Sequence, residues 1–167
     1  MLTARNRIHA LFARTHAPRC KRLRELEEAA ELAAKLAEAF PDPQRSLFGI
    51  AELITNGIEH GNCGIGYTEK GNLLRSGQWH HEVARRLALP ENAEKWLHVE
   101  LLQRGDGIGI YVRDEGNGFR WQPYLEIDPH RVEDLNGRGI ALARHVAFDA
   151  LHYSKRGNEV WAFCRAR

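Results

Sequence analysis

Three short segments contain most of the residues whose types and spacing could do chemistry. They read GIAELITNGIEHGN at residues 49–62, RDEGNGF at residues 113–119 and NGRGIALARH at residues 136–145. The first offers a carboxylate and an amide one helical turn apart, and the second offers an aspartate before two glycines. The third places glycines and an arginine where a helix is expected to begin. Together these groups indicate a nucleotide site, although each segment alone is a weak signal.

The first segment places Glu52, Asn56 and His60 at four-residue intervals, which puts them on one face of a helix. An asparagine carbonyl is a suitable oxygen ligand for Mg²⁺, which keeps several waters and phosphates in its shell. A carboxylate one turn earlier can accept a proton from a hydroxyl or a water. By itself, however, the pattern favours a solvated polar stripe on an amphipathic helix, and a lone His60 favours an ordinary helix end.

The second segment places Asp114 after an expected strand and before Gly116 and Gly118. Glycines permit positive φ angles and let a ligand ring approach the backbone closely. A buried, ionised aspartate can accept a hydrogen bond from an exocyclic amine such as that of adenine. The alternative is a plain Asp/Gly turn, and such turns are common.

The third segment places Gly137, Arg138 and Gly139 at the expected start of a helix. Free backbone N–H groups and the positive helix end bind phosphate at such a position, and an arginine adds a charge-assisted contact. A glycine loop before an ordinary core helix is the alternative. The preceding residues, 121–135, are polar and proline-containing, which predicts a mobile loop that closes over a nucleotide as a lid.

Periodicity and turn residues predict an α+β chain, in which helices pack on one face of a mostly antiparallel sheet. The expected helices are residues 21–40, 43–60, 80–88 and 139–148, and the expected strands are residues 96–102, 108–112, 150–154 and 159–165. Apart from its short helix, the segment 63–95 has no clear pattern.

The composition limits the classes of protein to consider. A chain of 167 residues suits one domain, and a formal net charge of +2 gives no indication of nucleic-acid binding. No apolar run approaches the roughly 20 residues of a membrane-spanning helix, and no secretory signal is expected. The three cysteines are widely spaced and form no CxxC pair, so neither a disulfide framework nor a zinc site is expected. We therefore expect a cytoplasmic protein with reduced thiols.

In this order, the three segments resemble the N box and the two glycine boxes of the GHKL ATPase superfamily, which includes gyrase and the histidine kinases. The form ELITNGIEHGN is most similar to the anti-sigma-factor serine kinases of bacterial stress and sporulation switches. The resemblance extends over about residues 20–167. It implies one GHKL-type ATP-binding domain over residues 1–167, with a Bergerat-type α/β sandwich of helices on a mixed, largely antiparallel sheet. It also implies ATP and Mg²⁺ as cofactors.

The resemblance assigns roles to single positions of this chain. Glu52 matches the general base, Asn56 the magnesium ligand and Asp114 the partner of the adenine amine. Two further groups of residues match positions that bind the nucleotide: Gly116 and Gly118 match the nucleotide turn, and Gly137, Arg138 and Gly139 match the residues that face the phosphates. His60 matches the last part of the N box.

The chain departs from the family pattern in two places. About thirty residues, 63–95, stand where the family has a short loop, and insertions of this length tend to be functional or mobile. The last hairpin reads GNEVWAFC, so Glu159 or Val160 stands near the place of a threonine that supports the adenine site in the family. Either adenine is held differently here, or nucleotide binding is weakened.

The resemblance leaves three functions open. The first is a serine/threonine kinase that phosphorylates a STAS-type anti-anti-sigma partner and can sequester a sigma factor on the same surface. The second is a non-catalytic module whose partner affinity depends on nucleotide. The third is a histidine-kinase catalytic domain, for which the chain is expected to be too short. Related kinases often dimerise, which suggests a homodimer; neither nucleic acid nor a membrane is expected as a partner.

Overall fold

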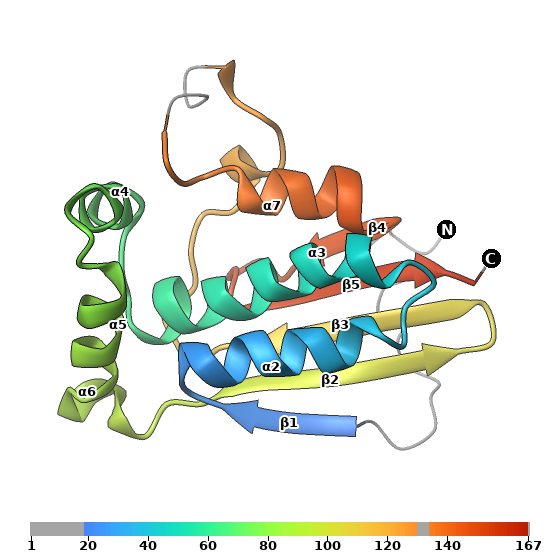
Figure 1. Cartoon of the computed structure of the whole chain (residues 1–167), viewed down its shortest axis with the longest axis horizontal. Coiled ribbons are helices and arrows are strands. Elements are labelled where there is room, and N and C mark those ends of the chain that lie inside the picture. Colours follow the sequence, from blue (N-terminus) through green and yellow to red (C-terminus); the bar gives the residue numbers. More distant parts are fainter. Residues whose placement is uncertain (1–18, 130–133, 167) are drawn as a thin grey trace.

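The computed structural model describes residues 19–129 and 134–166 of the chain. Within these ranges five strands form one sheet in the order β1-β2-β3-β5-β4, and every neighbouring pair is antiparallel. Figure 1 shows the sheet with its helices. The strands are β1 (Arg19–Leu23), β2 (Leu97–Arg104), β3 (Gly107–Arg113), β4 (Ala150–Tyr153) and β5 (Glu159–Arg165).

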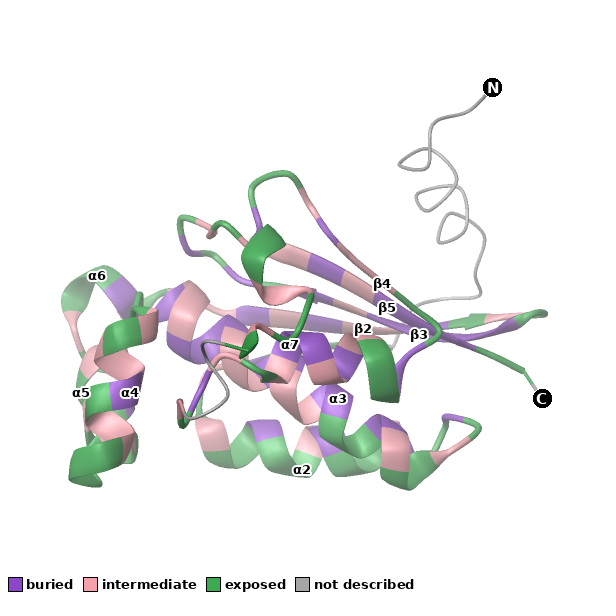
Figure 2. Cartoon of the chain, turned by 90° about the horizontal axis from the view of Figure 1, so that it is seen from above, coloured by how far each residue is buried: buried purple, intermediate pink, exposed green. Residues whose placement is uncertain are grey.

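Three helical segments cover one face of this sheet (Figure 2). They are α2 (Leu26–Ala37), α3 (Pro43–Asn56) with its continuation η1 (Gly57–Asn62), and α7 (Gly139–Leu142) with its continuation η4 (Ala143–Ala147). The central helix α3 buries Ile50, Leu53 and Ile54 completely, and the facing strand residue Ile110 is equally inaccessible. The core therefore lies between α3 and the middle of the sheet, which fixes the position of the first segment.

The start of α3 follows the sequence signals. The Asp42 side chain accepts a hydrogen bond from the Arg45 backbone N–H at 3.1 Å, and Pro43 occupies the first helical position. At its other end the helix widens into the π-helical turn η1, where the Cys63 N–H donates to the Ile58 carbonyl at 2.9 Å. Single π-turns inside α-helices often occur at functional sites.

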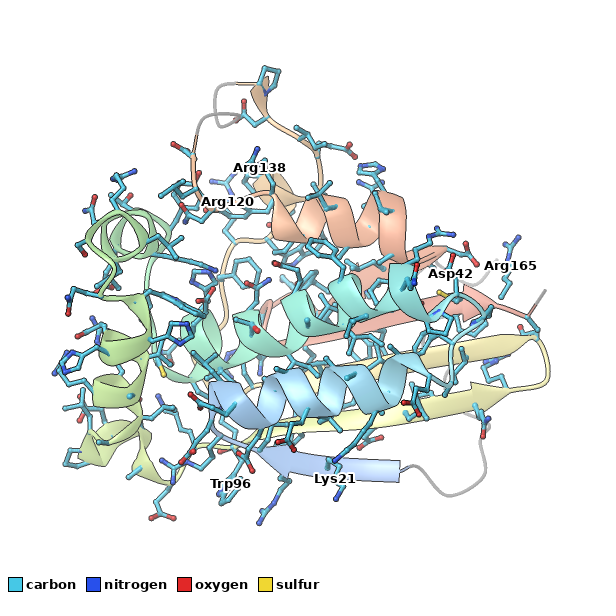
Figure 3. All side chains as sticks on the ribbon, viewed as in Figure 1. Lys21, Asp42, Trp96, Arg120, Arg138 and Arg165 are labelled. Carbon is cyan, nitrogen blue, oxygen red and sulfur yellow. The ribbon has the colours of Figure 1, made fainter. Side chains whose placement is uncertain are left out.

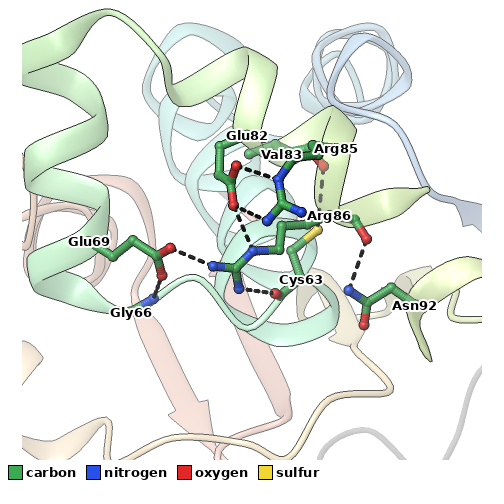
Figure 4. A network of polar contacts seen from close by, with 8 residues as sticks. All are labelled: Cys63, Gly66, Glu69, Glu82, Val83, Arg85, Arg86 and Asn92. Carbon is green, nitrogen blue, oxygen red and sulfur yellow. Dashed lines mark hydrogen bonds and ion pairs between the residues drawn. The ribbon is translucent and has the colours of Figure 1, made fainter. Parts of the chain in front are cut away.

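The segment 63–95 forms three helices at one end of the sheet (Figure 1). They are α4 (Tyr67–Ser76), α5 (Trp79–Leu87) and α6 (Pro90–Ala93). Arg86 of α5 joins them to the core, because its guanidinium donates to Glu82 at 2.8 Å, to Glu69 of α4 and to the Cys63 carbonyl at 3.2 Å (Figure 4). The inserted segment is therefore fixed to the end of η1.

The α+β prediction is confirmed, with a sheet that is antiparallel in every ladder of the described residues rather than mixed. The predicted helix 21–40 is wrong at its start, because residues up to Leu23 belong to the edge strand β1. Leu23 is buried and pairs with Leu97, so a distant strand outweighs the local helical period. The helix begins after Glu25, whose N–H donates to Glu28 Oε2 at 3.2 Å.

The other predicted helices and strands agree with the structure to within two residues, whereas α4 and α6 were not predicted. Within residues 19–129 and 134–166 no helix is both long and apolar enough to cross a membrane.

Candidate functional site

A cleft with a volume of about 990 Å³ opens between α3–η1, the inserted helix α4 and the segment that leads into α7. Most of the predicted site residues line it: Glu52, Asn56, His60, Gly118, Gly137, Arg138 and Gly139. Asp114 lies instead in a smaller adjoining cavity of about 30 Å³, which shares several lining residues with the cleft. The fold thus brings three segments that are far apart in the sequence to one place.

Glu52 lies half-buried in the wall of the cleft, against the start of α7. A Cβ atom built on Gly139, the first residue of α7, would collide with the Glu52 carboxylate, so any larger residue there would have to push that carboxylate aside. Burial raises the pKa of Glu52, although the Lys70 ammonium nearby opposes this shift. A carboxylate with a raised pKa is a stronger base than an exposed one.

Asp114 follows β3 directly and is 9% exposed. Its Oδ1 accepts a hydrogen bond from the Gly116 N–H at 2.9 Å, which is the role that the structure gives to Gly116. Burial raises the pKa of Asp114 to about 6. Because an ionised carboxylate can accept about four hydrogen bonds, Asp114 keeps acceptor capacity for a ligand.

Two glycines of the site adopt backbone conformations that other residues rarely adopt. Gly118 has φ +77° and Gly137 has φ +88°. In addition, a Cβ on Gly118 would collide with the Arg156 carbonyl, and one on Gly137 would collide with the Tyr67 ring. The second and third segments therefore need glycine for both conformation and space.

Arg138 lies exposed at the rim of the cleft, and its Nη2 donates to the Asp134 carbonyl at 3.1 Å. Figure 3 shows it at the start of α7, on the side of the molecule away from Trp96. Nearby, the buried Asn136 donates to the Tyr67 carbonyl at 2.8 Å. The inserted helix α4 is thus attached to the residues that lead into the third segment.

The predicted mobile loop, residues 121–135, is packed at its beginning. Trp121 donates from Nε1 to the Ser154 carbonyl at 2.9 Å and stacks on Tyr153. The short helix η2 (Gln122–Tyr124) follows it. The beginning of the segment is therefore anchored to β4, its mobility as a lid stays a prediction, and residues 130–133 lie outside the described ranges.

Glu59 lines neither the cleft nor the adjoining cavity, but it lies beside the site and was not singled out in the sequence. It is fully buried and accepts hydrogen bonds from Lys70 Nζ and from Trp79 Nε1, the latter at 2.7 Å. Burial would raise the pKa of Glu59, but His60 and Lys70 outweigh it and hold that pKa below its usual value. Glu59 lies in the π-helical turn η1, so the α-helical spacing from Asn56 does not predict where its side chain points.

His60 lies at the cleft, but its ring nitrogens are engaged by the protein. Nδ1 is hydrogen-bonded to the Ile65 carbonyl, and Nε2 lies 3.0 Å from Glu59 Oε1. The ring therefore links η1 to the beginning of the inserted segment. In this arrangement His60 is a structural residue rather than a group that faces a ligand.

Within the described ranges no group of three or more His, Cys, Asp or Glu side chains is placed to hold a metal ion. Asn56 lines the cleft, and its side-chain carbonyl is an oxygen of the kind that Mg²⁺ binds beside phosphates and waters.

No protein-family model matches the chain, and a search of curated proteins found no significant match. The geometry defines a site in which a cleft lined by a carboxylate, an amide and two glycine segments adjoins a cavity with a buried aspartate.

Proposed function

We propose that this protein is a GHKL-type, ATP- and Mg²⁺-dependent kinase that phosphorylates a serine or threonine of a STAS-type anti-anti-sigma partner. One observation carries the proposal: Glu52 and Asn56 line the same cleft as residues 137–139, and Asp114 lies in the adjoining cavity. A base, a metal ligand, a phosphate loop and an acceptor for an amine are thereby arranged around one space.

The residues present fit an adenine nucleotide. Asp114 has unused acceptor capacity and a cavity beside it, which suits the exocyclic amine. Asn56 supplies an amide oxygen for Mg²⁺, and residues 137–139 supply backbone N–H groups and the Arg138 guanidinium for phosphates. Bound ATP would supply the phosphoryl group that is transferred.

Glu52 is the base in this proposal. Its raised pKa favours acceptance of a proton from the hydroxyl of the partner, and its contact with Gly139 places it at the start of the phosphate loop. Arg138 and the loop amides stabilise charge on the transferred group.

The first test is calorimetric titration of the protein with Mg-ATP, beside the Asp114→Asn variant. We expect saturable binding by the wild type and a loss of about 10²-fold in the variant, because the amide no longer accepts the adenine amine as a charged group. Absence of binding by the wild type would refute the proposal.

A second test addresses transfer itself, with a STAS-domain protein and labelled ATP. Glu52→Gln is expected to keep ATP affinity within about threefold and to lower the transfer rate by at least ~10². Equal rates would exclude Glu52 as the base.

One observation favours the second function, a binding module that does not transfer phosphate. Helix α4 holds the residues leading into α7 through Tyr67 and Asn136, so a nucleotide in the cleft would act on a surface that includes the inserted segment. A Glu52→Gln protein that retains full nucleotide-dependent partner binding, with no transfer by the wild type, would favour this function.

A further inference from the structure

Tyr153 of β4 is a buried residue whose hydroxyl has no hydrogen-bond partner among the residues that the structure describes. The residue is 4% exposed, and within residues 19–129 and 134–166 no group is hydrogen-bonded to its hydroxyl. The ring itself is tightly held, edge-on to Phe119 at 5.5 Å and stacked on Trp121 at 5.8 Å between centroids.

The hydroxyl belongs to the cavity of Asp114. Tyr153 lines this cavity together with Asp114 and Asn56. Burial raises the pKa of Tyr153, and the charges of Asp114 and Glu52 raise it further, so the group stays a neutral hydrogen-bond donor. The cross-strand neighbour of Tyr153 in the sheet is Val160, which has no polar group to offer.

The cavity thus presents two polar groups of opposite kind that the protein leaves available, an acceptor on Asp114 and a donor on Tyr153. Adenine carries an amine next to a ring nitrogen with a lone pair, so it offers a donor beside an acceptor. Guanine presents a carbonyl beside an N–H group at the same edge, which is the reverse pattern. In the orientation that suits adenine, guanine would place its carbonyl against Asp114 and its N–H group against Tyr153, so the pair favours adenine over guanine.

We propose that Tyr153 is a specificity-determining residue whose hydroxyl donates a hydrogen bond to N1 of adenine while Asp114 accepts one from the exocyclic amine. This inference rests on the proposed nucleotide site and adds the residue that selects adenine over other nucleobases.

The test uses Tyr153→Phe, which keeps the ring contacts and removes the hydroxyl. Tyr111→Phe is the matched control, since the Tyr111 hydroxyl donates to Glu159 at 2.8 Å and Tyr111 lines neither the cleft nor the cavity. Calorimetry with Mg-ATP and Mg-GTP is expected to show about a tenfold loss of ATP affinity in Tyr153→Phe, a smaller preference for ATP over GTP, and no change in Tyr111→Phe.

A change of ligand tests the same hydrogen bond in the unaltered protein. We expect 1-deaza-ATP, in which a C–H group replaces N1, to bind the wild type about tenfold more weakly than ATP, and to bind Tyr153→Phe as well as ATP does. Wild-type binding of ATP with equal binding of 1-deaza-ATP, or with an unimpaired Tyr153→Phe variant, would overturn the role of Tyr153 and leave the nucleotide site standing. A wild type that binds neither ATP nor GTP would overturn both.

Discussion

Glu59 and Asp114 are two buried acids near the same end of the cleft, yet their surroundings differ in kind. Glu59 is fully inaccessible and faces donors from Lys70, Trp79 and His60, which together hold its pKa below the usual value. The Asp114 carboxylate accepts a hydrogen bond from one backbone N–H group, that of Gly116, and burial raises the pKa of Asp114 to about 6. The first carboxylate is satisfied by the fold, and the second is left short of partners.

The number of donors around each carboxylate distinguishes an acid with a structural role, Glu59, from an acid that is available to a ligand, Asp114. A buried charge that is fully hydrogen-bonded fixes the elements that surround it, and here Glu59 joins η1 to α4 and α5. A buried charge with few partners destabilises the fold and gains most when a ligand completes its shell. The Tyr153 hydroxyl in the same cavity, which no residue of the described ranges partners, resembles Asp114 in this respect.

The largest expected effect is that of breaking the satisfied cluster. Glu59→Gln leaves the mostly buried Lys70 ammonium without its counter-charge, so we expect the free energy of unfolding to fall by about 3–5 kcal/mol. Urea denaturation at pH 7 measures it. Glu31→Gln is the control, because the Glu31–Lys35 pair lies exposed on α2 at 3.9 Å and should change stability by less than about 0.5 kcal/mol.

The pH dependence sharpens this prediction. Because the folded pKa of Glu59 is lowered, its stabilisation is present above the unfolded value near 4.5 and is lost as the pH falls through the folded pKa. The difference between wild type and Glu59→Gln should therefore shrink in acid. Equal stability of the two proteins at pH 7 would contradict the structural role of Glu59.

Asp114→Asn is expected to act in the opposite direction. The folded pKa of about 6 lies above the ordinary aspartate value of 3.8, so the folded wild type binds more protons than the unfolded chain and loses stability as the pH rises between these values. At pH 7 the amide should raise the free energy of unfolding by about 3 kcal/mol, and near pH 3 this gain should vanish. Denaturation of the wild type and of Asp114→Asn at both pH values measures this difference in the free energy of unfolding. A variant that is less stable than the wild type at pH 7 would show that the fold stabilises the Asp114 carboxylate, as it does that of Glu59.

The sequence predicts the parts of the fold whose signals are local. The Asp42–Pro43 start of α3 and the last hairpin carry their own cap and turn residues, and both were found as expected. Strand β1 was misread as helix because its pairing partner, Leu97–Arg104, lies more than seventy residues further along the chain. The capping pair Glu25 and Glu28 marked the true helix start.

The same division holds for the site. Spacing along one helix predicts that Glu52 and Asn56 share a face, and both line the cleft, whereas Glu59 lies in the π-helical turn that this spacing does not describe. Lys70 and Tyr153 could not be found in this way, because only the packing of the inserted helix and the register of β4 with β5 bring them to the cleft and cavity. Contacts between segments that are far apart in the chain produce no regular spacing of residues that a single sequence could reveal.

A smaller effect follows for ligand binding, since only the ionised form of Asp114 accepts a hydrogen bond from an amine without competition from its own proton. With a pKa of about 6, roughly a tenth of the carboxyl is ionised at pH 5. Adenosine affinity should therefore fall about tenfold between pH 8 and pH 5, and adenosine is the suitable probe because it carries no phosphate. A flat profile for the wild type, like that expected for Asp114→Asn, would remove Asp114 from the binding site.

The smallest expected change concerns Glu52, a third acid, which is half-buried, lines the cleft and is packed on Gly139. In Gly139→Ala the new methyl group displaces the flexible end of Glu52 into the cleft, so stability should change by less than about 1 kcal/mol. Mg-ATP affinity should fall about fivefold, because a carboxylate then lies closer to the phosphates. Gly66→Ala is the control, since nothing lies near a Cβ at Gly66, which also lines the cleft. Equal affinities in the two variants would mean that the contact between Glu52 and Gly139 does not hold the carboxylate away from the nucleotide.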